Sequence, residues 1–583
     1  MRELEKTLFD HIIFIYGKAQ AKPIFQRIIN RLNYFKTQYP DLSKSSPHKR
    51  VSECDIILIT YGDMVQSDGE KPLKTLAKFL EKYISSSIST VHILPFFPYS
   101  SDDGFSVIDY YQVNPELGDW TDIHDLGKNY RLMMDAVVNH ISTHSTWFQG
   151  FLNGDPKYEN YFSVIEKDTD LSQVFRPRAS PILTPFETSS GRKYVWTTFS
   201  EDQVDLNYAN PDVLIEVIDI LLFFAAHGAE FIRLDAVTYV WKEIGTSCIN
   251  SAHTHRIVQT IRTIFDMVAP KTAIITETNV PHKDNIAYFG DGKNEAQMVY
   301  NFALPALTLH SFQVGDAETL STWASTLDLP SDQATFFNFL ACHDGIGLMP
   351  VKNILNEREI QNIIDRTLKL GGFVSYKNNE DGSQSPYELN INYLDALGNP
   401  KLVETDIGFV ARRFIASQSI MLALRGIPGI YFHSLFGSQN WKEGVQKTNR
   451  YRTINREKIP LENLERELAD TNSLRYMVFS MFIRMLKLRT SHPAFHPWGD
   501  QKILFLDSRL FTTLRSSMDG TEHALCLTNV TDRSVDLSID MRSMPFADSN
   551  SIIDLLNGRL FSISQEPLKL TISPYQVIWL ISQ

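Results

Sequence analysis

EFIRLDAV, residues 230–237, is an apolar run that two charged side chains interrupt. Its composition is typical of a strand that is buried on both faces. Arg233 and Asp235 lie two residues apart, so strand geometry points both side chains to the same face. Burying a charge is costly unless the charge is paired or used. The segment therefore predicts a buried strand that ends in either a structural ion pair or a functional site.

Seven further apolar runs of this kind occur along the chain, and each is followed by a stretch with helical periodicity. They are DIILIT (55–60), VHILPF (91–96), LMMDAVV (132–138), TAIITE (272–277), QMVYNF (297–302), ATFFNFLA (334–341) and GIPGIYF (426–432). Eight strand–helix units in succession are typical of a (β/α)8 barrel, although an open parallel sheet would give a similar pattern. We therefore predict an α/β fold with a TIM barrel in residues 51–499.

Four regions depart from the repeating pattern. Residues 1–50 have apolar positions at helical spacing, which predicts an N-terminal helical extension. Residues 141–205 and 351–400 follow the third and seventh strands and are longer than ordinary loops. We expect them to form insertions at the carboxyl ends of the strands, where barrel active sites are built. Residues 500–583 alternate apolar and polar positions, which predicts a C-terminal antiparallel β domain.

The composition argues against several classes of protein. The 583 residues have a formal charge of −12, spread along the chain without a stripe of Lys and Arg, so nucleic-acid binding is not expected. No apolar run is long enough to span a membrane. The N-terminus lacks the pattern of a signal peptide. The widely spaced Cys54, Cys248, Cys342 and Cys526 are typical of free thiols in a reducing compartment. We therefore expect a cytoplasmic protein.

Polar side chains collect at the predicted carboxyl ends of four strands. They are Asp135, Asn139 and His140 at the third strand, Arg233 and Asp235 at the fourth, Glu277 at the fifth, and His343 and Asp344 at the seventh. Taken singly, an Asp after a strand is most often a helix cap, and an Arg–Asp pair can be purely structural. The spacing of His140 and His144 could suggest a metal, but no HExxH motif or acidic ligand supports one, so we expect neither metal nor cofactor. Strand ends of a barrel converge on one pocket, and the joint occurrence therefore predicts a catalytic site.

Two carboxyl groups beside one bond are what glycosyl transfer requires. One ionised carboxylate attacks the anomeric carbon, while a second group, kept protonated by apolar surroundings, gives a proton to the leaving oxygen. In such a site Arg233 would hold Asp235 ionised and aimed. Asp344 would bind sugar hydroxyls and stabilise the positive charge that develops on the sugar.

The motifs around these residues resemble the signature regions of the α-amylase superfamily, in the same order along the chain: DAVVNH, FIRLDAV, ITETN and ACHDGIG. Further segments resemble the sucrose phosphorylase branch of that superfamily: LITYGD, ILPFFPYSSDDGF, RPRASP, KEIGTSC, FALPALTLH and TINRE. The resemblance implies retention of configuration, with two carboxyl groups roughly 5 Å apart.

The resemblance also implies roles for individual residues. Asp235 matches the nucleophile, Glu277 the general acid/base and Asp344 the transition-state stabiliser. The residues that it implies for the donor sugar are Asp102, Phe105, His140, Arg233, His343 and Arg456. Arg178 and Tyr387 fall in the two insertions, where such enzymes bind phosphate or the acceptor. We include Phe199 and Glu388 among the substrate-binding residues.

Two departures from sucrose phosphorylases bear on the acceptor. Those enzymes commonly have Glu-Val-His where this chain has Glu-Thr-Asn (277–279), and Leu-Tyr-Gln where it has Pro-Tyr-Glu (386–388). The stretches TETNVPH and DGSQSPYELN, with the N-terminal helices, resemble the glucosylglycerate phosphorylases of the same branch. We expect Glu388 to repel or orient an anionic acceptor, unless Arg178 or Arg192 offsets its charge.

The leading hypothesis is a retaining phosphorylase that transfers glucose from an α-glucoside, glucosylglycerate-like, to inorganic phosphate. Its partners are then small molecules, and a homodimer is an open alternative to a monomer. The arginines of RPRASP favour phosphate as the acceptor. Other hypotheses are a sucrose or glucosylglycerol phosphorylase, a retaining hydrolase that uses water instead of phosphate, and a non-catalytic sugar-binding barrel. The last predicts loss of a catalytic carboxylate, whereas Asp235, Glu277 and Asp344 are all present.

Overall fold

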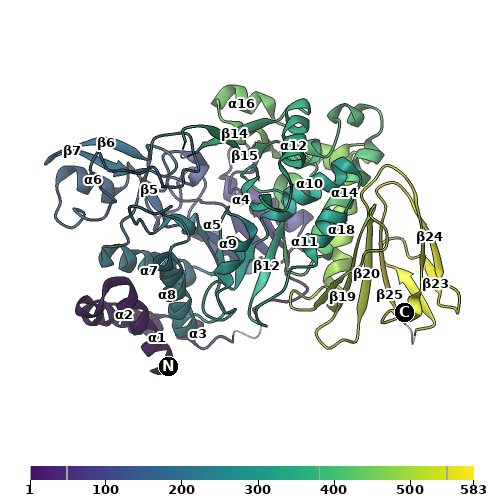
Figure 1. Cartoon of the computed structure of the whole chain (residues 1–583), viewed down its shortest axis with the longest axis horizontal. Helices are drawn as coiled ribbons and strands as arrows, with labels where there is room; N and C mark the ends of the chain where they lie inside the picture. The colour runs from purple at the N-terminus through teal and green to yellow at the C-terminus, as the bar shows by residue number, and fades with distance from the viewer. Residues whose placement is uncertain (1, 47–49, 380, 547–548, 583) are drawn as a thin grey trace.

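Eight parallel strands close into a barrel at the centre of the computed structural model, which describes residues 2–46, 50–379, 381–546 and 549–582 (Figure 1). In order around the barrel they are β1 (Ile57–Thr60), β3 (Thr90–Ile93), β4 (Arg131–Val137), β9 (Ala229–Asp235), β10 (Ala273–Thr276), β11 (Met298–Tyr300), β12 (Thr335–Phe339) and β16 (Ile427–Tyr431). Each predicted apolar run overlaps one of these strands, so the predicted TIM barrel is confirmed.

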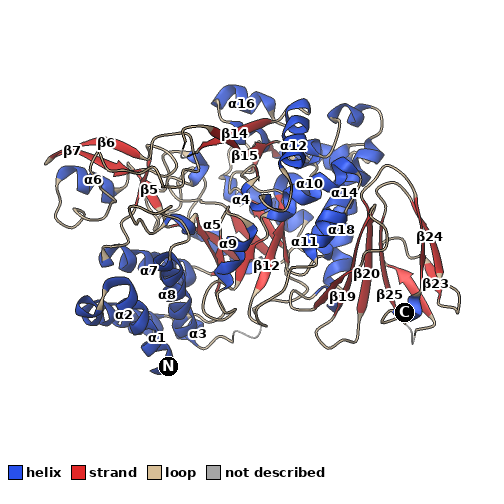
Figure 2. Cartoon of the chain, viewed as in Figure 1, coloured by secondary structure: helices blue, strands red, loops and turns tan. Residues whose placement is uncertain are grey.

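Helices surround this barrel (Figure 2). They include α4 (Pro72–Tyr83), α5 (Trp120–Asn129), α7 (Pro211–Ala226), α8 (Ala252–Val268), α10 (Ala303–Val314), α11 (Glu318–Ala324), α14 (Ile407–Ala423) and α18 (Leu474–Thr490). No helix among the described residues is both long and apolar enough to cross a membrane.

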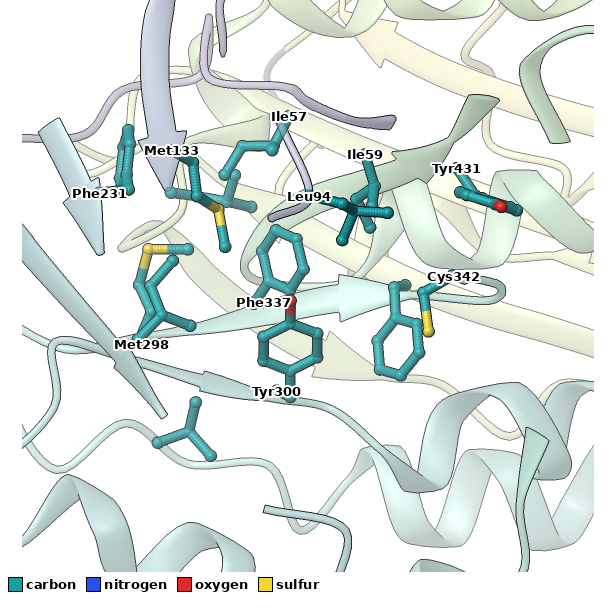
Figure 3. Packing of buried hydrophobic residues seen from close by; sticks show 14 of the residues in the cluster. Ile57, Ile59, Leu94, Met133, Phe231, Met298, Tyr300, Phe337, Cys342 and Tyr431 are labelled. Carbon is teal, nitrogen blue, oxygen red and sulfur yellow. The ribbon is translucent and has the colours of Figure 1, made fainter. Parts of the chain in front are cut away.

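Apolar side chains fill the interior of the barrel. Figure 3 shows buried side chains from its strands, among them Ile57, Met133, Phe231, Met298 and Phe337. Along β9 the side chains alternate, so Phe231, Arg233 and Asp235 share one face. In the strand register Arg233 lies beside Asp135 of β4 and Ile275 of β10. The charged pair therefore lies above the apolar interior, and Asp235 is at the carboxyl end of the barrel.

Both long connections contain extra elements at that end. After β4 come β5 (His140–Ser142), α6 (Thr146–Asn153), β6 (Leu183–Thr188), β7 (Gly191–Trp196) and β8 (Gln203–Asp205). After β12 come β13 (Ile346–Gly347), α12 (Glu357–Lys369), β14 (Phe373–Asn378) and β15 (Gln384–Asn390). The two insertions contact each other, because the Asn378 side-chain amide donates a hydrogen bond to the Ala179 carbonyl oxygen at 2.9 Å. They thus meet over the mouth of the barrel.

The N-terminal extension is helical, as predicted. Its helices are α1 (Arg2–Tyr16), α2 (Lys18–Gln38) and α3 (Pro40–Ser43), and they pack against α7 and α8 on the outside of the barrel (Figure 1). Leu8, Ile12, Ile28 and Leu32 are completely buried. Residues 47–49, within the predicted N-terminal region, lie outside the described residues.

The C-terminal region is an antiparallel β domain, as predicted (Figure 2). A six-stranded sheet contains, in spatial order, β18 (Asp500–Ile503), β19 (Leu510–Ser516), β20 (His523–Asn529), β25 (Val577–Ser582), β22 (Ser551–Asp554) and β23 (Leu560–Ser562). A second pair is formed by β21 (Val535–Ile539) and β24 (Leu568–Ile572). We propose residues 1–50, 51–499 and 500–583 as the limits of the three regions.

Candidate active site

A pocket at the carboxyl end of the barrel gathers most of the predicted site residues. Those that line it are Asp102, Phe105, His140, Arg178, Phe199, Asp235, Glu277, His343, Asp344, Tyr387 and Glu388. Arg233 and Arg456 do not line it. Arg233 contacts Asp235 and is 2% exposed, whereas Arg456 lines an adjoining recess that shares Asp102 with the pocket.

Arg233 joins two carboxylates from neighbouring strands. It contacts the Asp135 carboxylate and donates a hydrogen bond to Asp235 Oδ1 at 2.7 Å. His92 Nε2 contacts the other oxygen of Asp135 at 2.6 Å. Burial opposes ionisation of Asp135, but Arg233 and His92 outweigh it and lower its pKa to about 2. Asp135 is thus a fixed anion that holds Arg233, which in turn holds Asp235.

Asp235 and Glu277 form a pair of buried carboxyl groups at the ends of β9 and β10. Burial raises the pKa of Glu277 above its ordinary value, and the charge of Asp344 adds to this rise. Burial also raises the pKa of Asp235, with a contribution from Glu277. Two such groups retain a shared proton more readily than either would alone. The positive charge of Arg233 stabilises the ionised form of Asp235 more than that of Glu277, because Arg233 lies 2.7 Å from Asp235 but 4.0 Å from Glu277. We therefore place the negative charge on Asp235 and the proton on Glu277.

The chain turns sharply between these two carboxyl groups. Ala236, directly after Asp235, has a left-handed backbone with φ 48°, an unfavourable conformation for a residue with a Cβ. Its N–H donates a hydrogen bond to Glu277 Oε2 at 2.9 Å. One oxygen of Glu277 is thereby fixed, which leaves the other to carry a proton toward the pocket.

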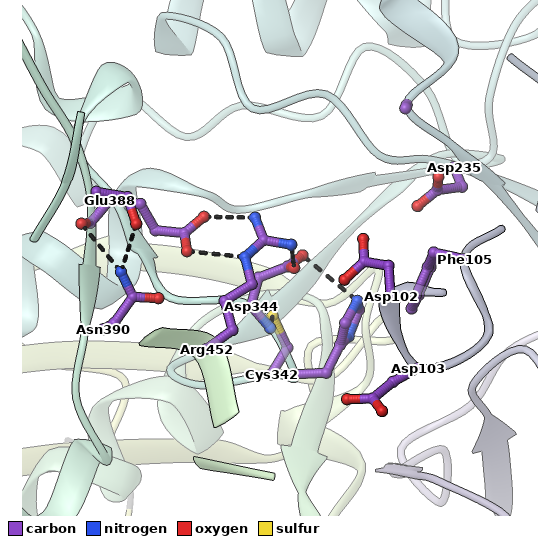
Figure 4. Close-up of polar contacts among 12 residues, drawn as sticks. Asp102, Asp103, Phe105, Asp235, Cys342, Asp344, Glu388, Asn390 and Arg452 are labelled. Carbon is purple, nitrogen blue, oxygen red and sulfur yellow. Dashed lines mark hydrogen bonds and ion pairs between the residues drawn. The ribbon is translucent and has the colours of Figure 1, made fainter. Parts of the chain in front are cut away.

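Asp344 lies among guanidinium groups rather than beside an apolar wall. Arg452 of η7 (Tyr451–Asn455) contacts its Oδ1 (Figure 4). Arg456 lies 3.8 Å from the same atom. Burial opposes ionisation, but Arg452 and Arg456 overcome it and lower the pKa of Asp344. The pKa of Asp344 is thus shifted in the direction opposite to that of Glu277, and Asp344 is the more readily ionised of the two.

His140, His343 and the Phe105 ring line the same pocket as the three catalytic carboxyl candidates. Phe105 stacks on His343 with ring centroids 4.5 Å apart and an angle of 8° between the planes. His140 Nε2 lies 2.9 Å from the Phe105 carbonyl oxygen, which fixes the proton on that nitrogen. Burial lowers the pKa of both histidines. They are therefore neutral hydrogen-bonding groups near pH 7.

Asp103 is a residue that the sequence analysis missed. Asp102 and Arg456 were both expected at the donor sugar, but Arg456 Nη1 lies 2.9 Å from Asp103 Oδ2 and 3.6 Å from Asp102 Oδ1. Both aspartates have left-handed φ values, 54° and 51°. Arg456 also donates a hydrogen bond from Nε to the His343 carbonyl oxygen at 2.7 Å. Asp103 is thus the nearer partner, and Asp102 lines the pocket.

Arg178 and Tyr387, from the two insertions, lie close together in the same pocket. The Arg178 guanidinium lies 5.6 Å from the centre of the Phe199 ring and 5.8 Å from that of Tyr387. No carboxylate pairs with Arg178 among the residues that the structure describes. Its charge is therefore available to an anion.

Glu388 is paired, although with neither arginine named in the sequence analysis. Arg192 instead contacts Glu187 in the exposed β6–β7 hairpin, at 2.5 Å. Arg452 binds Glu388 through two parallel contacts of 2.9 and 2.6 Å, and Figure 4 shows it between Glu388 and Asp344. The available signal was the pair Arg450 and Arg452 directly before the TINRE motif, which itself contains Arg456.

One set of potential metal ligands occurs within the described ranges: Cys342, His343 and Asp344, with ligand atoms within 4.8 Å of one another. Arg452 already contacts Asp344 there, and Arg456 is close by. Two guanidinium groups at the same carboxylate oppose a divalent cation. These residues therefore fit a sugar hydroxyl better than a metal.

Comparisons with known proteins agree with this geometry. A model of the α-amylase catalytic domain matches residues 79–345. A glucosylglycerate phosphorylase of Spirochaeta thermophila is 47% identical, over 100% of this chain and 98% of that protein. A glucosylglycerate phosphorylase of Escherichia coli is 43% identical, over 99% of this chain and 100% of that protein. The crystal structure of a sucrose 6F-phosphate phosphorylase from Thermoanaerobacter thermosaccharolyticum has a TM-score of 0.71 at 24% identity, covering 89% of this chain and 98% of that chain.

Proposed function

The chain belongs to the sucrose phosphorylase branch of the α-amylase family, and we propose that it is a retaining phosphorylase that transfers glucose from glucosylglycerate to phosphate. The full-length similarity to two glucosylglycerate phosphorylases supports this substrate. The observation that carries the mechanism is that Arg233 lies closer to Asp235, at 2.7 Å, than to Glu277, at 4.0 Å. It gives two buried carboxyl groups opposite protonation states, as double displacement requires.

In the first half-reaction Asp235 attacks the anomeric carbon of the glucoside. The bond between that carbon and the glycosidic oxygen breaks, and Glu277 gives its proton to the oxygen as glycerate leaves. A glucosyl ester on Asp235 results. Asp344, ionised beside its two arginines, stabilises the positive charge on the sugar in the transition state.

In the second half-reaction a phosphate oxygen attacks the anomeric carbon from the face that glycerate left. Glu277, now ionised, accepts the proton of the phosphate, and the ester bond to Asp235 breaks. Two inversions at one carbon give α-glucose 1-phosphate with retained configuration. Arg178 supplies the charge that binds phosphate in a pocket otherwise rich in carboxylates, because a guanidinium presents a planar fork to phosphate oxygens.

The purified protein offers a direct test. Glucosylglycerate, sucrose and glucosylglycerol are each incubated with and without millimolar phosphate, and glucose 1-phosphate and glucose are measured. We expect phosphate-dependent glucose 1-phosphate from glucosylglycerate, with lower rates from the other two. Release of glucose at one rate with and without phosphate would identify a hydrolase and refute the proposal.

A further inference from the structure

A charged pair of Glu388 and Arg452 lines the pocket beside Asp344, and neither residue reacts with the substrate in the mechanism above. Glu388 is 1% exposed. Arg452 Nε lies 2.9 Å from Glu388 Oε1, and Nη2 lies 2.6 Å from Oε2. This bidentate contact is the stronger of the geometries that Arg–carboxylate pairs adopt. Both residues line the same pocket as Asp235 and Glu277.

The backbone fixes Glu388 at this place. β15 pairs with β13, and Gly347 lies opposite Glu388. Gly345 directly follows Asp344, and a Cβ on it would lie 2.4 Å from the Leu389 carbonyl oxygen and 2.6 Å from Glu388 Cγ. Glycine at this position therefore allows the strand that carries Glu388 to approach the chain beside Asp344.

Glu388 lines the same pocket as Arg178 and Tyr387, where we propose that phosphate binds, and we call this part of the pocket the acceptor side. An uncompensated carboxylate there would repel phosphate and glycerate. Arg452 keeps its own charge, since Asp344 and Glu388 raise its pKa even though burial acts to lower it. The Arg452 guanidinium contacts both Glu388 and Asp344. It therefore links the acceptor side to the carboxylate that we propose stabilises the transition state.

We infer that Arg452 is a positioning residue that holds Glu388 and cancels its charge, and thereby makes the acceptor side of the pocket accept anions. This inference rests on the proposed phosphorylase function. Removal of Arg452 leaves a buried carboxylate unpaired, which disfavours a charged acceptor but not a neutral one.

The test measures how the glucosyl-enzyme divides between phosphate and water. α-Glucosyl fluoride serves as the donor at fixed phosphate, and the ratio of glucose 1-phosphate to glucose is measured. Arg452→Gln should lower that ratio by about tenfold or more. Adding Glu388→Gln removes the unpaired charge and should restore the ratio to within about threefold of wild type. A purely structural role for Arg452 predicts no such restoration.

Arg192→Gln is the matched control, because it breaks an Arg–Glu pair that is exposed on the β6–β7 hairpin. It should leave the ratio within about twofold of wild type. If Arg452→Gln does not fold, Glu388→Gln alone still tests the inference: it leaves Arg452 less neutralised and should lower the KM for phosphate.

Three results would overturn the inference: an unchanged ratio in Arg452→Gln, no restoration in the double variant, or a higher phosphate KM in Glu388→Gln. Failure of the proposed function is a separate result, because the wild-type protein would then form no glucose 1-phosphate from glucosylglycerate, whatever the product ratio with α-glucosyl fluoride.

Discussion

The donor side and the acceptor side of the pocket are built from different kinds of structure. On the donor side Asp235 ends a barrel strand, and Glu277 and Asp344 closely follow two others. On the acceptor side Arg178 and Tyr387 come from two insertions that only meet in the folded chain. Strand register fixes the first group to one geometry. The second group can change with the insertions while the barrel stays the same, so we expect chemistry on one side and acceptor choice on the other.

The largest effect should follow from the donor side. Asp235→Ala removes the nucleophile, so no glucosyl-enzyme can form, and kcat should fall by roughly three orders of magnitude or more. Thermal unfolding and circular dichroism should show an intact fold. Retention of more than about a tenth of wild-type kcat would mean that another group attacks the sugar.

Glu277→Gln should separate substrates by their leaving groups. It should lower kcat/KM on glucosylglycerate by about 10²- to 10⁴-fold, but should affect α-glucosyl fluoride far less, because fluoride leaves without a proton. An equal loss on both substrates would assign the acid to a different residue.

The pH profile of glucosylglycerate cleavage provides a second measurement on Glu277. Burial raises the pKa of this group, and the step requires its protonated form. The rate should therefore fall as pH increases through the raised pKa of Glu277, and it should also fall at low pH, where Asp235 takes up a proton and can no longer attack. The glutamine of Glu277→Gln has no group that titrates. The residual kcat/KM of this variant should therefore not decrease as the pH rises.

These donor-side residues could be predicted because apolar runs mark where strands end, and the ends of eight parallel strands meet at one place. Arg452 could not be predicted in the same way. Its contact with Glu388 joins residues 64 positions apart, one in the short helix η7 and one in strand β15 of an insertion, and no periodicity encodes that contact. The sequence also shows two adjacent aspartates, Asp102 and Asp103, but it does not show which of them pairs with Arg456. That pairing depends on the left-handed backbone at both aspartates.

Arg178 should have a smaller effect, limited to the acceptor side. Arg178→Ala removes the cation that has no carboxylate partner among the described residues, so the KM for phosphate should rise by about tenfold to a hundredfold. Free glucose should increase relative to glucose 1-phosphate, while formation of the glucosyl-enzyme from α-glucosyl fluoride changes little. A phosphate KM equal to that of wild type would show that Arg178 serves only to pack its loop.

Substitution of Asp103 should have the smallest effect on the reaction. It tests whether the donor side and the acceptor side of the pocket act independently. Asp103 holds Arg456 at 2.9 Å, and Arg456 in turn donates a hydrogen bond to the carbonyl of His343 beside the sugar. Asp103→Asn keeps the shape but removes the charge, so we expect the KM for glucosylglycerate and for glucose 1-phosphate to rise by about threefold to tenfold each, with kcat little changed. The ratio of glucose 1-phosphate to glucose should stay at the wild-type value, because within the described ranges the ion pair of Asp103 is with Arg456 and not with Arg178 or Arg452. Asp63→Asn, which loosens a neighbouring pair with Lys458 at 2.6 Å, is the control and should leave both KM values unchanged. A shift in the product ratio for Asp103→Asn would show that the two sides are coupled through Arg456 and Asp344, and the division between chemistry and acceptor choice would then be wrong.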